Sequence, residues 1–173
     1  MNKSLVLTGM MGVGKSTVGK SLANKLNYTF VDIDKLIEAK EGSSINLIFQ
    51  NKSESYFRKL ENEISLKELK RNRCVISLGG GAFLNNSIRQ KVKKSAISFW
   101  LDVNLGELIK RLKNSKKRPL LIKKNLSEAV SKIYFERKRT YSEANFKIKC
   151  NFLKTEEIVK KILKHYESSG NKV

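Results

Sequence analysis

The segment at residues 9–16, with the sequence GMMGVGKS, constrains the fold of this chain more than any other feature. It satisfies the pattern G-x-x-x-x-G-K-[ST] at every required position. In this pattern the glycines let backbone amides point at phosphate oxygens, the lysine reaches the β- and γ-phosphates, and the hydroxyl binds Mg²⁺. We therefore predict a nucleotide-phosphate loop, with Ser16 as a Mg²⁺ ligand; its residues are Gly12, Val13, Gly14, Lys15, Ser16 and Thr17. The loop alone does not separate a kinase from a GTPase or a motor ATPase.

The apolar pattern around the phosphate loop predicts the fold class. Short apolar runs predict strands at residues 4–8, 28–32, 74–78, 96–101 and 146–150, and three of them are continuous enough for burial on both faces. Amphipathic patterns predict helices at 15–26, at 104–112 with Asn104 and Glu107 as a capping pair, and after Thr155 as an N-cap. Strands that alternate with helices predict a three-layer α/β fold with a parallel sheet, in one domain over residues 1–173.

Two aspartates stand at the end of the second predicted strand. Alternation along an extended chain places the side chains of Asp32 and Asp34 on the same side. Ligands of open α/β sheets bind at this carboxyl edge. We predict that Asp32 joins Ser16 in the Mg²⁺ site, and that Asp34 orients or deprotonates the hydroxyl group that accepts the phosphoryl group. Alternatively, Asp34 serves as the N-cap of the following helix.

Three consecutive glycines follow the third predicted strand. Gly79, Gly80 and Gly81, here called the glycine triplet, cost backbone entropy and contribute no side-chain packing. A turn from strand to helix needs only one glycine. The triplet therefore indicates that a small ligand approaches bare backbone here.

Two arginines are candidates for binding an acidic group of that ligand. A guanidinium binds a carboxylate through two parallel hydrogen bonds, which fixes orientation as well as charge. Arg58 follows Phe57, and Arg137 continues the apolar stripe of Val130 and Ile133. A charge on a buried stripe indicates a partner.

The chain is strongly basic, with 36 Lys and Arg against 16 Asp and Glu and a net charge of +20. Such an excess favours anionic partners. Nucleic-acid binding predicts a continuous basic stripe interleaved with aromatic residues, which is not visible, so we expect no nucleic-acid partner.

The densest cluster of basic residues lies at 116–124 around Arg118. We interpret it as a lid that closes over the phosphates; a basic surface loop is the alternative.

Composition also bounds the location of the protein. The chain has no apolar run of 18 residues and no signal-peptide pattern, so we expect no transmembrane span and a cytoplasmic location. A monomer is the expected state, but it does not follow from these patterns. Cys74 and Cys150 lie in apolar runs and are predicted to be buried, unreactive thiols.

The ordered motifs resemble those of the shikimate kinases over roughly residues 4–166. They are the phosphate loop, Asp32-x-Asp34, Phe57-Arg58-x-x-Glu61, the glycine triplet, Arg118-Pro119-Leu120-Leu121 and Glu136-Arg137. The resemblance implies a five-stranded parallel sheet of the nucleoside-monophosphate-kinase type. It also implies a substrate-binding helical region at about 34–61 and a mobile lid at about 112–125.

The resemblance further implies residue roles. Asp34 would contact the ring hydroxyls of shikimate and act on the one being phosphorylated, while Arg58 and Arg137 would hold the carboxylate. Gly80, within its triplet, would make a backbone contact to the substrate. Arg118 would close over the phosphates, and Arg111 would lie on the adenine. The implied catalytic residues are Lys15, Asp34 and Arg118.

The sequence departs from the family pattern at three places. The usual Pro-Leu-Tyr segment after Glu-Arg is replaced, so either Arg137 or Arg139 could meet the carboxylate; the spacing to Tyr141 favours Arg137. Ser53 stands where the family commonly has glycine, and we expect this exchange to be harmless. The segment at 151–154 matches poorly, so no adenine contact is predicted there.

The implied reaction converts ATP and shikimate into ADP and shikimate 3-phosphate, in the chorismate branch of aromatic amino-acid biosynthesis. One alternative is another small-metabolite kinase of this fold, such as a gluconate kinase or a nucleoside-monophosphate kinase. The arginine pair and the glycine triplet favour a compact carboxylate substrate. A second alternative, a nucleic-acid-binding P-loop protein, is suggested only by the net charge.

Overall fold

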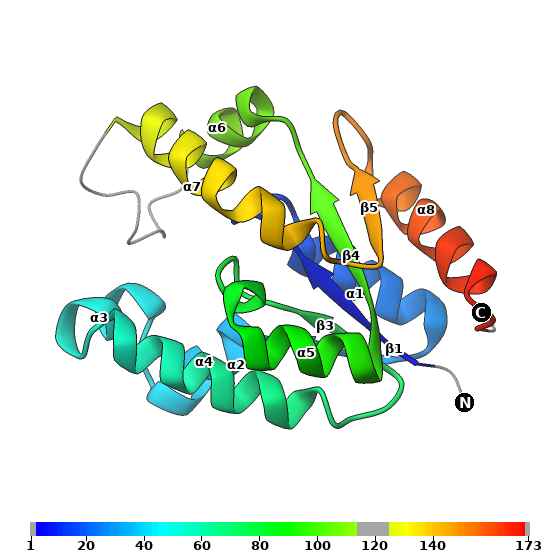
Figure 1. Ribbon diagram of the computed structural model, residues 1–173, viewed down its shortest axis with the longest axis horizontal. Helices are drawn as coiled ribbons and strands as arrows, with labels where there is room; N and C mark the ends of the chain where they lie inside the picture. Colours follow the sequence, from blue (N-terminus) through cyan, green and yellow to red (C-terminus); the bar gives the residue numbers. More distant parts are fainter. Residues whose placement is uncertain (1–2, 114–124, 172–173) are drawn as a thin grey trace.

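The computed structural model describes residues 3–113 and 125–171. Its centre is a five-stranded sheet in the order β2-β3-β1-β4-β5, in which every neighbouring pair is parallel (Figure 1). The strands are β1 (Ser4–Thr8), β2 (Thr29–Asp32), β3 (Cys74–Ser77), β4 (Ala96–Asp102) and β5 (Phe146–Lys149). All five predicted strands are confirmed, with ends that differ by one residue at most.

Helices cover both faces of this sheet. α1 (Lys15–Leu26) and α8 (Thr155–Ser168) lie on one face, whereas α5 (Asn86–Ser95) and α7 (Leu126–Tyr141) lie on the other (Figure 1). The remaining elements are α2 (Ile33–Glu41), α3 (Ile45–Asn51), α4 (Glu54–Glu68), the 3-10 helix η1 (Ala82–Leu84) and α6 (Leu105–Lys113). The predicted three-layer α/β fold with a five-stranded parallel sheet is confirmed.

Apolar strands build the core, because the central positions of a covered sheet are closed to water on both faces. Every residue of β1 and β3 is buried, as are all residues of β4 except its last. The apolar stripe of α8 packs against α1 and β5, and its buried residues are Ile158, Val159, Ile162 and Tyr166. Cys74 and Cys150 are buried free thiols, and burial raises the pKa of Cys150 to about 11.

Local boundaries correct three expectations. β2 ends at Asp32 and α2 begins at Ile33, so Asp34 lies in a helical turn and not on an extended strand. Asp32, not Asp34, is the N-cap, since its carboxylate accepts from the amide of Lys35 at 3.3 Å. Thr155 is the first residue of α8 and not its cap. Of the predicted capping pair, the Asn104 half is confirmed, because its Oδ1 accepts from the amide of Glu107 at 2.9 Å. The Glu107 half is wrong, since the Asn104 amide donates to Asn151 Oδ1 at 2.8 Å.

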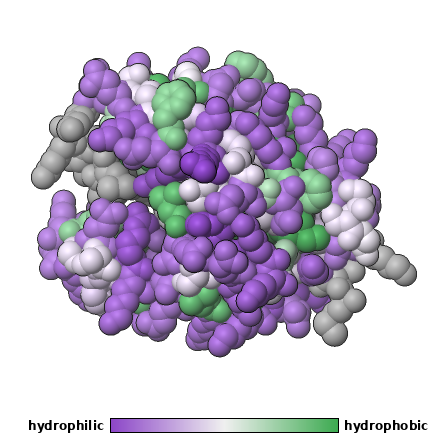
Figure 2. All heavy atoms as spheres, viewed as in Figure 1, coloured by the Kyte–Doolittle hydropathy of each residue, from purple (hydrophilic) through white to green (hydrophobic). Residues whose placement is uncertain are grey.

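The face of the molecule in Figure 2 is mainly hydrophilic, with apolar residues in separate patches. Within residues 3–113 and 125–171, no helix is long and apolar enough to cross a membrane. The predicted region at 34–61 corresponds to most of α2, all of α3 and half of α4. Of the predicted lid at 112–125, residues 114–124 lie outside the described part of the chain.

Ser53, at the junction of α3 and α4, has the unusual backbone angles φ 131° and ψ 165°. This region is essentially restricted to glycine, and other residues occupy it at a cost of about 1–3 kcal/mol. We expected the exchange of glycine for serine to be harmless, and this is wrong as far as the conformational energy of the backbone is concerned. The serine hydroxyl offsets a small part of the cost by accepting from the amide of Tyr56 at 3.2 Å as the N-cap of α4.

Ser53→Gly is expected to stabilise the protein by about 1–2 kcal/mol, because glycine adopts these backbone angles without strain. Glycine is a slightly poorer N-cap than serine, but this costs only about a few tenths of a kcal/mol. Thermal unfolding should show a midpoint raised by about 2–8 °C. Ser44→Gly is the matched control, since Ser44 caps α3 at an ordinary φ of −69°. An equal or greater stabilisation in Ser44→Gly would contradict the strain argument.

Candidate active site

The phosphate loop joins β1 to α1. Gly14 stands at the N-cap of α1 with a φ of 96°, a left-handed conformation that glycine adopts without strain. The ammonium group of Lys15 is buried and donates to the carbonyl oxygens of Gly9 and Met10, each at 2.9 Å. The lysine therefore lies across the loop, at the positive N-terminal end of the helix where phosphates bind.

Ser16 and Asp32 meet beside this loop. The Ser16 hydroxyl donates to Asp32 Oδ2 at 2.5 Å, which brings together the two residues predicted to hold Mg²⁺. A hydroxyl, a carboxylate and phosphate oxygens form a donor set that suits Mg²⁺. Within the described residues no group of three or more His, Cys, Asp and Glu side chains could hold a metal. The pair therefore fits a magnesium ion that is also bound by nucleotide phosphates.

A cleft of about 230 Å³ connects the phosphate loop to the ends of β2 and β3. Its lining includes the loop residues Gly12, Gly14, Lys15, Ser16 and Thr17 together with Asp32, Asp34 and Gly80. The two aspartates thus face the same space as the phosphate loop, although Asp34 reaches it from the first turn of α2.

The glycine triplet is closely surrounded by charged side chains and by the phosphate loop, and a Cβ on Gly79 or Gly81 would come closer than 3.0 Å to a side-chain atom. A Cβ on Gly79 would lie 2.5 Å from Glu61 Oε1 and 2.7 Å from Asp34 Oδ1, and one on Gly81 would lie 2.4 Å from Arg58 Nη1. A Cβ on Gly80 would lie 3.2 Å from the amide nitrogen of Met11 and 3.7 Å from Arg137 Nη1. The structure therefore gathers Asp34, Arg58 and Arg137 around the triplet, next to the phosphate loop.

Arg58 is held in place by acidic neighbours on its own helix. Its Nη1 donates to Glu61 Oε2 at 2.7 Å, while its Nε and Nη2 donate to Glu54 Oε1 at 3.3 and 3.2 Å. The guanidinium also lies over the ring of Phe57, 5.2 Å from its centroid. These contacts orient the arginine toward the glycine triplet before any ligand binds.

Arg137 is buried and points inward from α7. Its Nη1 donates to the carbonyl oxygen of Gly80 at 2.9 Å, and the Tyr141 hydroxyl, one turn later, donates to the same oxygen at 2.5 Å. Burial raises the pKa of Tyr141, so the hydroxyl stays protonated and remains a donor. Arg139 is exposed on the opposite side of the helix. Of the two alternatives, only Arg137 lies at the glycine triplet.

Arg111 lies at the other end of the phosphate loop. Its Nη1 donates to the carbonyl oxygen of Val13 at 3.5 Å, and it forms an ion pair with Glu107. The other carboxylate oxygen of Glu107 accepts from the backbone amide of Phe152 at 3.2 Å, so Glu107 links the segment after β5 to Arg111. Arg118 lies outside the described residues, and its predicted place in a lid stays a prediction.

Sequence reasoning assigned no role to two residues of this site. Glu61 is buried and holds Arg58, and its spacing of three on a helix from Arg58 is the signal that could have revealed the pair. Tyr141 served only as a spacing marker, whereas the structure shows its hydroxyl on the carbonyl of Gly80. No sequence pattern indicates a hydrogen bond that spans 61 positions.

Burial raises the pKa of Glu61, and the opposing effect of the Arg58 guanidinium is smaller. Its Oε1 is buried without a hydrogen-bond partner among the described residues. A raised pKa in the folded state means that folding favours the protonated form. The resulting stabilisation is present below the ordinary pKa of about 4.3 and is lost as the pH rises through the raised value.

The difference in unfolding free energy between the wild type and Glu61→Gln is therefore expected to fall as the pH rises from about 4 to 7, with a slope of at most about 1.4 kcal/mol per pH unit. Urea unfolding at several pH values measures it. Glu63→Gln makes the same exchange at an exposed carboxylate on the same helix and is the matched control for the substitution itself. A difference that grows with pH would mean that Arg58 lowers the pKa of Glu61 overall.

Comparison with known proteins places this geometry in context. The sequence model of the "Shikimate kinase" family matches residues 11–167. A curated relative named shikimate kinase, from Sulfurihydrogenibium sp. (strain YO3AOP1), is 46% identical over 161 residues, which cover 93% of this chain and 96% of the relative.

Solved structures agree with the sequence relatives. The shikimate kinase from Acinetobacter baumannii in complex with shikimate superposes with a TM-score of 0.94 at 31% identity, covering 98% of this chain and 96% of that one. A gluconokinase from Sinorhizobium meliloti 1021 reaches a TM-score of 0.59 at 17% identity over 96% and 93% of the two chains, which shows a shared fold alone. With a family match over nearly its whole length and relatives of the same name that cover it almost completely, this chain belongs to the shikimate kinase family.

Proposed function

We propose that this protein transfers the γ-phosphoryl group of ATP to the 3-hydroxyl group of shikimate, producing ADP and shikimate 3-phosphate. The observation that carries the proposal is the position of Asp34, Arg58 and Arg137 around the glycine triplet, beside the phosphate loop. Shikimate carries hydroxyl groups and a carboxylate. The carboxylate of Asp34 suits a hydroxyl group, and the two guanidinium groups suit the carboxylate of the substrate.

The two arginines bind the carboxylate of the substrate. A carboxylate accepts parallel hydrogen bonds from a guanidinium, and two guanidinium groups together fix its orientation. The glycine triplet allows the ring to lie against backbone that no Cβ obstructs. When the carboxylate of the substrate is held rigidly, the reacting hydroxyl group lies at a set distance from the phosphate loop. Such positioning lowers the activation barrier of phosphoryl transfer, because the orientational freedom of the substrate is lost on binding and not in the reaction step.

Asp34 acts on the hydroxyl group that is phosphorylated. As the hydroxyl oxygen attacks the γ-phosphorus, its O–H bond breaks and the proton passes to the Asp34 carboxylate. The bond between the γ-phosphorus and its bridging oxygen breaks at the same time, and the electron pair leaves with ADP.

Phosphate binding is assigned to the loop residues 12–17, with Lys15 on the β- and γ-phosphates. Arg111 lies on the adenine, and Arg118 closes over the phosphates. Ser16 and Asp32 hold Mg²⁺, which neutralises phosphate charge when bound. We propose that region 34–61 and the lid at 112–125 belong to a single domain, and that the enzyme acts as a cytoplasmic monomer.

A panel of acceptors tests the proposal. Purified protein is incubated with ATP and Mg²⁺ and with shikimate, gluconate, nucleoside monophosphates or DNA, and ADP release is measured. Stimulation by shikimate alone is expected, and removal of Mg²⁺ by EDTA should abolish it. Stimulation by gluconate or by a nucleotide would favour a different kinase of this fold, and stimulation by DNA would favour a nucleic-acid-dependent ATPase.

A further inference from the structure

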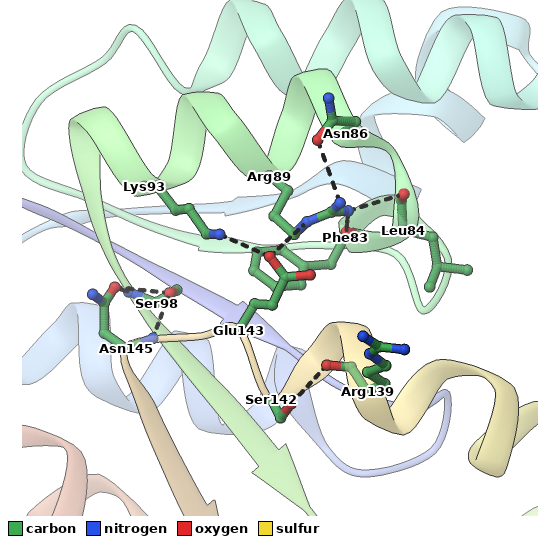
Figure 3. Close-up of polar contacts among 10 residues, drawn as sticks. All are labelled: Phe83, Leu84, Asn86, Arg89, Lys93, Ser98, Arg139, Ser142, Glu143 and Asn145. Carbon is green, nitrogen blue, oxygen red and sulfur yellow. Dashed lines mark hydrogen bonds and ion pairs between the residues drawn. The ribbon is translucent and has the colours of Figure 1, made fainter.

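α7 and the glycine triplet are joined at two places. The inner contact is the carbonyl oxygen of Gly80, which accepts from Arg137 and Tyr141. The outer contact is made by Arg89 of α5, which lies between the end of η1 and the chain segment that follows α7 (Figure 3). The outer contact lies apart from the cleft beside the phosphate loop.

Arg89 uses its whole guanidinium group. Its Nη1 donates to the carbonyl oxygens of Phe83 and Leu84, each at 3.0 Å, and its Nη2 donates to Asn86 Oδ1 at 3.3 Å. Its Nε donates to Glu143 Oε2 at 3.2 Å. Only 15% of the Arg89 side chain is exposed, whereas 38% of the Glu143 side chain is, so water reaches this ion pair mainly from the Glu143 side.

On one side, this contact reaches the glycine triplet through η1. The amide of Ala82 donates to the carbonyl oxygen of Gly79, and the amide of Leu84 donates to that of Gly81, both at 3.1 Å. Any shift of η1 therefore moves the backbone of the triplet.

On the other side, the contact reaches Arg137 through Glu143. The amide of Glu143 donates to the carbonyl oxygen of Thr140 at 3.1 Å, which attaches Glu143 to the last turn of α7. Lys93 also donates to Glu143 Oε2, at 2.7 Å (Figure 3). The cations Lys93 and Arg89 lower the pKa of Glu143, so its carboxylate is charged at neutral pH.

We propose that the ion pair of Arg89 and Glu143, here called the Arg89–Glu143 bridge, sets the position of Arg137 relative to the glycine triplet. The bridge thereby tunes the affinity for the carboxylate of the substrate. This inference rests on the proposed function. Arg89 is a positioning residue: it touches no part of the cleft, and it joins the two backbone segments between which the acid is bound.

An arginine is required because of geometry as well as charge. A guanidinium presents five donors in a rigid plane, whereas an ammonium is a point charge that cannot reach two carbonyl oxygens, an amide and a carboxylate together. Arg89→Lys therefore keeps the charge but loses the connection between η1 and the end of α7.

The KM for shikimate is expected to rise about tenfold in Arg89→Lys, a typical size for coupled neighbours, while the KM for ATP stays within about twofold. Glu143→Gln keeps the shape without the charge and should give a smaller rise, about threefold. Glu136→Gln makes the same charge change on an exposed carboxylate of α7 and is expected to match the wild type. If Arg89→Lys does not fold, as judged by circular dichroism, Glu143→Gln carries the test.

A double-mutant cycle separates positioning from a purely structural role. If Arg89 acts through Arg137, Arg89→Lys should change the KM for shikimate less than twofold in an Arg137→Lys background. Three results would overturn the proposed role of the Arg89–Glu143 bridge. The first is a full tenfold effect of Arg89→Lys in the Arg137→Lys background, and the second is an equal rise in the KM values for shikimate and ATP. The third is an unchanged KM for shikimate with only a lower melting temperature. A wild-type protein that does not phosphorylate shikimate would overturn the proposed function itself, and the inference with it.

Discussion

Replacing Asp34 with asparagine is expected to lower kcat for shikimate by about two to four orders of magnitude, the range over which a positioned general base accelerates proton transfer. Asparagine keeps the size of the side chain and can still hydrogen-bond a hydroxyl group, but it cannot take the proton. The KM values for shikimate and ATP should therefore change by only a few fold. Steady-state kinetics of the purified variant measure all three quantities.

The position of Asp34 makes this prediction specific. Asp32 already serves as the N-cap of α2 and accepts from Ser16, so Asp34 is not needed to start the helix. Asp34→Asn is expected to leave the melting temperature nearly unchanged, and Glu63→Gln, at an exposed carboxylate of α4 just beyond region 34–61, should leave kcat unchanged as well. A decrease in kcat below tenfold would remove Asp34 from the catalytic step.

Arg137→Lys is expected to raise the KM for shikimate by about 30-fold or more, since breaking one member of a buried, hydrogen-bonded charge pair costs about 2 kcal/mol or more. Lysine keeps the charge but cannot form two parallel hydrogen bonds with a carboxylate. The KM for ATP should remain close to that of the wild type, because Arg137 contacts Gly80 and not the nucleotide loop carbonyls.

Arg139→Lys is the matched control for this prediction. It makes the same exchange two residues away on the same helix, on an exposed side chain. Its KM for shikimate is expected to stay within about twofold of the wild type, the size of ordinary surface effects. If Arg139→Lys were the variant with the larger KM, the assignment of the acid-binding arginine would be reversed.

Features formed by neighbouring residues could be predicted from the sequence. The phosphate loop is a contiguous segment in which every functional group belongs to one turn, so the motif alone predicts the cradle. The strands β1, β3 and β4 could be found because burial on both faces requires continuous apolar runs. Helical periodicity also put Arg137 on the buried stripe of α7, where the structure has it.

Features that depend on competing local interactions were predicted less well. Whether β2 continues to Asp34 or stops at Asp32 depends on which carboxylate caps α2, and alternation along a strand cannot decide this. The backbone angle of Ser53 is imposed by the way α3 and α4 meet, and a family comparison of residue types alone did not show its cost.

The sequence by itself determined the α/β fold and the phosphate loop, because both follow from contacts within short segments. Only the tertiary structure decided that Arg137 reaches Gly80 across 57 positions, and that Arg89 joins η1 to Glu143 across 54. Such contacts depend on the relative placement of whole helices on the sheet. That placement is set by the packing of many apolar residues at once, and no single segment of the sequence encodes it.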